Sequence, residues 1–135
     1  MSQDSLVGHR EAVAGMASDL FDVVGIPFEE TTELQRQLLA AFAFGMMFAV
    51  VHFEKLSPPD AHALAIAMLM DSFRYSDHQA ADQADLLIRA SQDARVHDTI
   101  NAVVHRGIDG HLQWQRDDLV ALKDNILGIF EAVGA

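Results

Sequence analysis

The chain contains no cysteine and only three prolines among its 135 residues. Without cysteine there are no disulfides, zinc–thiolate sites or thiol nucleophiles. Few prolines and a half-apolar composition exclude a disordered chain. Basic residues are also scarce, since nine Lys and Arg face twenty Asp and Glu, for a net charge of −11. Such a chain repels a phosphate backbone, so we expect no nucleic-acid partner, and a basic protein is the natural partner of an acidic surface.

The chain also lacks an apolar run as long as the roughly 20 residues that span a membrane. Its longest run extends from Leu38 to Val51, too long for a typical strand and without a turn signal. A helix that is apolar on every side has to be buried by other elements, so this run predicts a central core helix. The N-terminus lacks a basic segment followed by an apolar one, so it does not resemble a secretory signal. We therefore expect a cytoplasmic protein without membrane contact.

Capping signals divide the chain into helices. Thr32 with Gln35 and Ser76 with Gln79 match the capping box, in which side chains satisfy the first free backbone N–H groups of a helix. Ser57 precedes two prolines suited to a first helical turn, and Asp117 or Asp118 can cap a last helix. Gly107 to Gly110 is typical of a turn. We predict an all-α, single-domain bundle over residues 1–135, with five or six helices at about 9–24, 32–53, 58–73, 76–90, 97–106 and 117–133.

Two predicted helices carry stripes of small residues at intervals of four, which place them on one helix face. Ala41, Gly45 and Ala49 form one stripe, and Ala63 and Ala67 form the other. Small stripes allow two backbones to approach closely, so we predict that these two helices cross there. We expect the methionines of the same helices to fill gaps in the core; they are Met46, Met47, Met68 and Met70.

The chemistry of the segment from His97 to Trp114 makes it our candidate interface, and unusual residues are densest from His105 to Trp114. His97, Asn101 and His105 recur every four residues and share one helix face, but the outer two lie about 12 Å apart, too far to bind one metal ion. This face is either a solvated polar ridge or a partner contact. Further along, either Arg106 pairs locally with Asp109 while Trp114 fills the core, or the segment forms an interface. We take seven residues as candidate partner-binding residues, with no catalytic or metal-binding residue and no cofactor: His97, Asn101, His105, Arg106, Asp109, His111 and Trp114.

His97-Asp98 also spells the dipeptide of the HD phosphohydrolases, which are all-helical metal enzymes. An HD site needs a further upstream His, such as His62 or His78, and a downstream Asp, such as Asp117 or Asp124. Imidazoles and carboxylates together suit a divalent ion that activates water. A chain with seven His and many Asp contains this dipeptide easily by chance. A metal-dependent phosphohydrolase therefore stays an alternative.

Acidic residues gather in two stretches that contain no base. One lies between Arg10 and Arg36, and the other between Arg74 and Arg89. If the two stretches share one side of the bundle, they form a negative face. A solvated surface is the other explanation for such a run of charge.

Four stretches resemble the immunity protein 48 family, predicted antidotes of bacterial polymorphic toxin systems. They are AFAFGM (41–46), LSPPDAHALAIAML (56–69), FRYS (73–76) and, most specifically, TINAVVHRGIDGHLQW (99–114). The resemblance runs from about Phe28 to Leu119. It implies an all-helical, non-enzymatic cytoplasmic protein that binds a cognate toxin and blocks it, with acidity that suits a basic toxin. It assigns no contact residues.

A third hypothesis is an oligomeric scaffold or regulator, such as a homodimer in which apolar helices complete a shared core. A homodimer would be compatible with immunity function as well. The sequence by itself leaves these alternatives open, and it does not identify the toxin.

Overall fold

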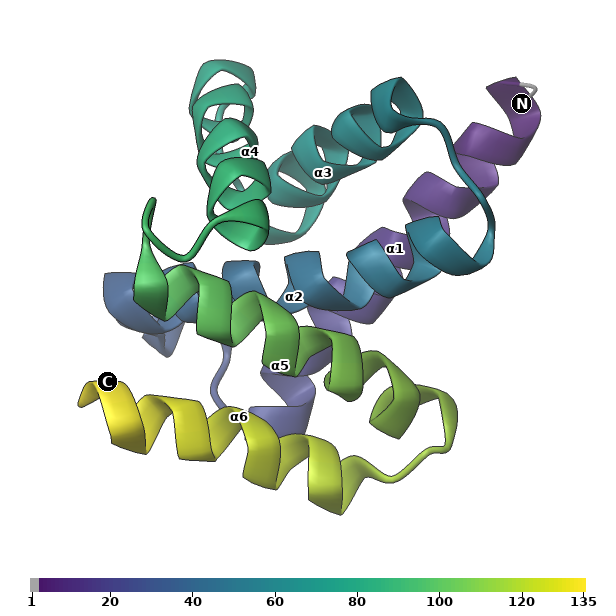
Figure 1. Cartoon of the computed structure of the whole chain (residues 1–135). Coiled ribbons are helices and arrows are strands. Elements are labelled where there is room, and N and C mark those ends of the chain that lie inside the picture. Colours follow the sequence, from purple (N-terminus) through teal and green to yellow (C-terminus); the bar gives the residue numbers. More distant parts are fainter. Residues whose placement is uncertain (1–2) are drawn as a thin grey trace.

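The computed structural model describes residues 3–135, with side chains from Leu6 onward. Over this range the chain forms six α-helices, one short 3-10 helix and no strand, which confirms the all-α prediction (Figure 1). Met1 and Ser2, part of the segment expected not to be a secretory signal, lie outside the described residues. The elements are α1 (Gln3–Val24), η1 (Phe28–Glu30), α2 (Glu33–Phe53), α3 (Pro58–Phe73), α4 (Asp77–Gln92), α5 (Asp98–Gln115) and α6 (Leu119–Val133).

The predicted caps form and set the starts of the helices. The Thr32 hydroxyl accepts the backbone N–H of Gln35 at 3.1 Å, while the Gln35 side chain accepts the N–H of Thr32 at 3.0 Å. A second capping box starts at Ser76. Ser57 caps α3 and Asp118 caps α6, each accepting a backbone N–H three residues ahead at 3.2 Å. Each cap satisfies donors that a helix start otherwise leaves free, so these boundaries are encoded locally.

α2 is the central helix, as predicted. It passes between α5 on one side and α1 on the other, with α3 and α4 above it in the view of Figure 1. Every residue from Leu38 to Met47 is buried, whereas Phe48 is 44% exposed and Phe53 is 79% exposed, so the last turns emerge from the core. By length and composition alone this helix could cross a membrane, and 56% of its most apolar stretch is buried inside the fold, as in a core helix.

At Gly45 the helix that approaches α2 closely is α5, so our prediction that α2 and α3 cross at their small stripes is wrong. A Cβ at Gly45 would lie 2.9 Å from the Cα of Gly107 and nearer still to the carbonyl oxygen of Val104. A Cβ at Gly107 would likewise meet the backbone of Phe42 and lie 3.0 Å from the Cα of Gly45. The two glycines thus face each other where the two helices cross. Gly45 of the α2 stripe is therefore used against α5, and Ala63 of α3 is exposed.

The predicted turn at residues 107–110 is also wrong, because α5 continues through it to Gln115. Gly107 and Gly110 are buried, and a Cβ at Gly110 would collide with the ring of Phe42. These glycines make room for the central helix instead of bending the chain. The helix survives their poor propensity because tertiary packing outweighs it.

Two smaller predictions also need correction. Met70 is 36% exposed and does not fill a gap, although Met46, Met47 and Met68 are buried. The first helix begins at Gln3, about two turns before the predicted start at His9. Apolar periodicity marks only the buried part of a helix. Nothing in residues 3–8 stops the helix, so α1 extends through them.

Candidate interaction surface

The first part of α5 uses two of the predicted residues to hold the helix in place. His97 is the N-cap, and its Nδ1 accepts the backbone N–H of Ile100 at 3.1 Å. The Asn101 amide donates to the carbonyl oxygen of Ala90 at 2.8 Å, which ties α5 to the end of α4. His105 Nδ1 lies 2.7 Å from the carbonyl oxygen of Asn101, so this nitrogen carries the proton. Of the three, Asn101 is partly buried, while the other two remain exposed.

Arg106 does not pair with Asp109, as one of our alternatives expected; it joins α5 to α6. Its Nε donates to Oδ1 of Asn125 at 2.8 Å, and its Nη2 donates to the Asn125 carbonyl oxygen at 3.0 Å. The Asn125 amide donates back to the Arg106 carbonyl oxygen and to Gln113 Oε1, at 3.3 and 3.2 Å. Asp109 stays exposed one turn away. Arg106 is thus a link between two helices as well as a surface cation.

Further along α5, His111 and Trp114 are less exposed than His97 and His105. His111 is 9% exposed, and burial lowers the pKa of its imidazole below the ordinary value. Trp114 is partly buried and packs against the core. The seven predicted residues therefore differ in what they face. Some contact the end of α4 or α6, some face solvent, and others lie toward the interior. The structure does not gather them on one surface, because a helix of 18 residues turns its side chains through every direction.

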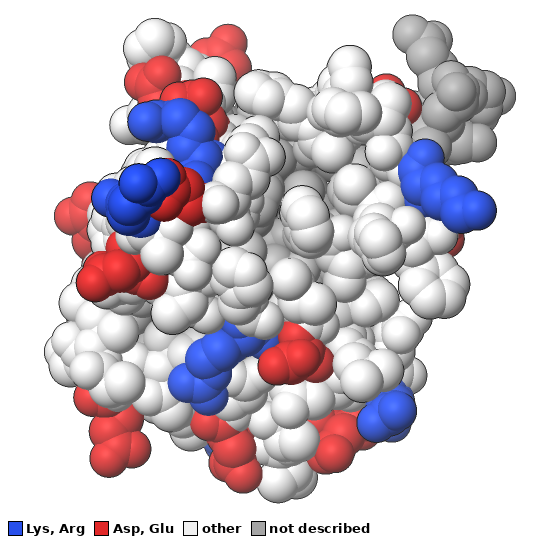
Figure 2. All heavy atoms as spheres, in the orientation of Figure 1, with Lys and Arg blue, Asp and Glu red and all other residues white. Residues whose placement is uncertain are grey.

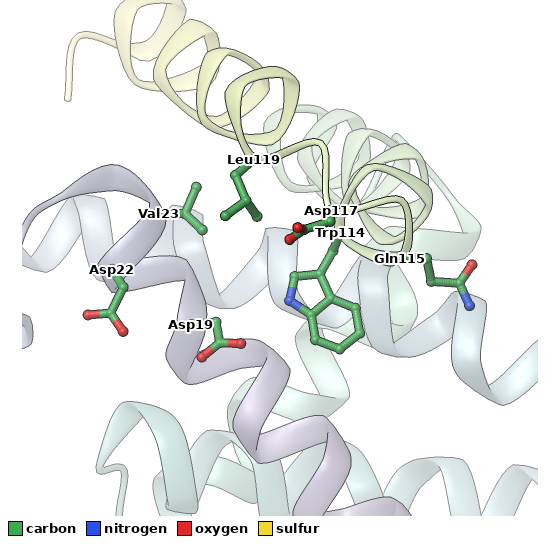
Figure 3. Close-up of a pocket in the computed structure, with 7 residues that line it drawn as sticks. All are labelled: Asp19, Asp22, Val23, Trp114, Gln115, Asp117 and Leu119. Atoms are coloured by element: carbon green, nitrogen blue, oxygen red, sulfur yellow. The ribbon is translucent and has the colours of Figure 1, made fainter.

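A cleft forms where Trp114 meets α1 at the end of α5. Its volume is about 610 Å³, and its seven lining residues come from α1, the end of α5, the α5–α6 connection and the start of α6 (Figure 3). In Figure 3 the indole points from the end of α5 toward α1, with Asp19 beside it and Asp22 at the outer edge. Asp117, from the connection to α6, lies above the ring. The lining residues are Asp19, Asp22, Val23, Trp114, Gln115, Asp117 and Leu119.

Sequence reasoning singled out Trp114 but missed its neighbours on α1. Asp19, Asp22 and Val23 are spaced by three and four residues, so they share one face of α1. That spacing was visible in the sequence, whereas the docking of this face against residues 114–119 was not. The cleft therefore depends on a long-range contact between α1 and the α5–α6 connection.

The rest of the acidic surface is partly neutralised. Arg74 donates to Glu29 at 2.9 Å, and a backbone hydrogen bond and this arginine lower the pKa of Glu29. Asp85 pairs with Arg89 at 3.0 Å. Figure 2 shows acidic and basic groups interspersed around an uncharged centre, so that face is not a continuous negative surface. The first acidic stretch runs over α1, η1 and the start of α2, and the second lies on α4; α1 and α4 both pack on α3 without extensive contact with each other.

A second concavity is almost free of charge. It has a volume of about 340 Å³ and lies between the end of α2, the start of α3 and the end of α4. Phe48, Val51 and Ile88 contribute to its apolar lining, and none of its lining residues is Asp, Glu, Lys or Arg. It is an ordinary apolar groove at the place where the central helix emerges from the core.

The constellation that an HD hydrolase requires is not assembled by the described residues. No three His, Asp or Glu side chains gather there closely enough to hold a metal ion. His97 directs Nδ1 to its own helix start, while His62 lies on α3 and Asp124 on α6. The dipeptide is therefore explained by helix capping.

No curated protein and no solved structure matches the chain significantly. The family model described as immunity protein 48 matches residues 9–134, a wider span than the stretches that carry the resemblance. Since this match covers nearly the whole folded chain, the protein belongs to the immunity protein 48 family.

Proposed function

We propose that this protein binds a cognate polymorphic toxin and neutralises it by contact, without a reaction of its own. The observation that carries the proposal is the family match over residues 9–134. The net charge of −11 supports a basic partner, because opposite charges speed encounter and favour the correct partner. The proposed setting is the cytoplasm, with no nucleic acid or membrane involved.

Occlusion is the mechanism that this architecture suits best. A bundle whose helices are capped and packed needs little ordering when it binds, so little of the interaction free energy is lost to entropy. The charge raises the association rate, while a few buried anchors slow dissociation. Trp114 is the strongest candidate anchor, because tryptophan is enriched among residues that dominate binding energy and this one lines a cleft.

The test is co-expression with the toxin-like reading frame beside the gene. We expect the toxin alone to stop growth, the pair to permit growth, and the purified proteins to co-elute. Occlusion also predicts that the toxin is titrated at a one-to-one ratio, whereas an enzyme would protect at far lower amounts. Protection without a stable complex, or at substoichiometric amounts, would reject occlusion. Purified protein that holds a divalent ion and hydrolyses phosphate esters would favour the HD alternative.

The oligomeric alternative is tested separately. The uncharged groove and the exposed Phe48 and Phe53 are the apolar surface that a shared core would require. Light scattering at micromolar concentration distinguishes a monomer from a dimer. A dimer that fails to protect against the toxin would favour a scaffold, while a protective dimer remains an immunity protein.

A further inference from the structure

The cleft at Trp114 lacks one of the three kinds of group that meet around Phe28 in the same molecule. At Phe28 the Arg74 guanidinium lies 4.1 Å from the ring centroid and also pairs with Glu29. An aromatic face, a carboxylate and a guanidinium are thus all present there. The cleft supplies the aromatic face and the carboxylates, but none of its lining residues is basic.

The carboxylates of the cleft are not engaged within the chain. Among the described side chains, the carboxylates of Asp19, Asp22 and Asp117 form no ion pair and accept no hydrogen bond. They come from two segments about a hundred residues apart in sequence, around one concavity of about 610 Å³. A concave site with an aromatic wall and unopposed negative charge is complementary to a cation.

Resting on the proposed function, we infer that the cleft receives a basic side chain, foremost an arginine, from the toxin. A guanidinium stacks its flat face on an indole and forms paired hydrogen bonds with a carboxylate, which an ammonium does less well. Val23 and Leu119 supply apolar surface for the methylene stem of the side chain. Leu119 and Val120 are 45% and 74% exposed, so the rim also offers apolar contact to residues beside the arginine.

Trp114 is the only tryptophan in the chain, which makes it a site-specific reporter. The protein is labelled with 5-fluorotryptophan and titrated with unlabelled toxin from the neighbouring gene, while 19F NMR follows the single resonance. We expect this resonance to shift as the complex forms. A complex seen by co-elution with an unmoved resonance would overturn the inference and leave the proposed function intact. Absence of any complex would overturn both.

Charge-matched variants separate the cleft from general acidity. Asp19→Asn with Asp22→Asn removes two charges at the cleft, and Glu11→Gln with Glu131→Gln removes two exposed charges elsewhere. We expect the cleft pair to weaken toxin binding at least tenfold, equal to about 1.4 kcal/mol, and the control pair to change it less than threefold. Circular dichroism checks that all four substitutions preserve the helices. Equal effects of the two pairs would assign the acidity to long-range steering and reject the cleft.

The complementary experiment identifies the cation on the toxin. Exposed arginines and lysines of the toxin are replaced by alanine one at a time and tested against the wild-type protein and Asp19→Asn. We expect one toxin residue whose loss matters much less once Asp19 is neutralised, as a double-mutant cycle shows for groups in contact. If the loss of binding from each toxin substitution simply adds to the loss from Asp19→Asn, no basic side chain occupies the cleft.

Discussion

Replacing Gly107 by alanine tests how α5 is held against the central helix. The added methyl would lie 3.0 Å from the Cα of Gly45 and would overlap the carbonyl oxygen of Phe42. Both obstacles are backbone atoms of a buried helix, so no side chain can rotate away to make room. Relief requires α5 to shift, because non-bonded carbon atoms settle about 3.5–4.0 Å apart.

The size of the effect follows from two opposing contributions. Overpacking of a well-filled core costs roughly 1–3 kcal/mol, and a clash with rigid backbone belongs at the upper end. Alanine gains about 1 kcal/mol over glycine within a helix. The free energy of unfolding should therefore fall by about 2 kcal/mol, which lowers the melting temperature by roughly 8 °C in a domain of this size.

The assay is urea unfolding followed by circular dichroism, with Gly15→Ala as the matched control. Gly15 lies inside α1, is exposed, and an added Cβ there meets no atom within 4 Å. Only the gain in helix propensity applies, so Gly15→Ala should stabilise the protein by about 0.5–1 kcal/mol. If Gly107→Ala stabilises to the same extent, the close approach of α2 and α5 does not constrain the fold and our reasoning about the two glycines is wrong.

Two further predictions concern the ends of α5. Asn101→Ala should cost about 1 kcal/mol of unfolding free energy in urea titrations, because the hydrogen bonds that its amide donates to carbonyl oxygens at the end of α4 are lost; no change would mean that α4 and α5 are held by apolar packing alone. Burial keeps the pKa of His111 below the value of 6.5 that it has when unfolded, so protonation favours the unfolded chain. The stability that the neutral imidazole contributes should thus be fully present above pH 6.5 and be lost as the pH falls through the lowered pKa of His111. His111→Gln should weaken this dependence, and an unchanged pH profile would refute the assignment.

Local chemistry made most helix boundaries predictable. The capping boxes at Thr32 and Ser76 use side chains three residues away, so their outcome depends on neighbours in sequence. Ser57 and Asp118 act over the same range. The buried run from Leu38 to Met47 was equally predictable, since a helix that is apolar on every side has no stable place except the core.

Two of the failures share one physical cause. Gly107 and Gly110 favour a turn when they are considered alone, and Arg106 with Asp109 suggests a local pair. In the folded chain the glycines lie against Phe42, and Arg106 reaches Asn125, nineteen residues further along. In both cases a partner distant in sequence determined the structure, and local propensity was too weak to oppose it.

The sequence by itself determined that the protein is an acidic, thiol-free bundle of helices around one apolar helix, because composition, capping and periodicity act over a few residues. It also pointed to Trp114 as a residue of interest. Only the tertiary structure decided that α2 crosses α5, that the predicted site residues diverge around a helix, and that Trp114 faces the aspartates of α1. These results depend on which helix surfaces pack together, and that choice is made by shape and burial over the whole chain.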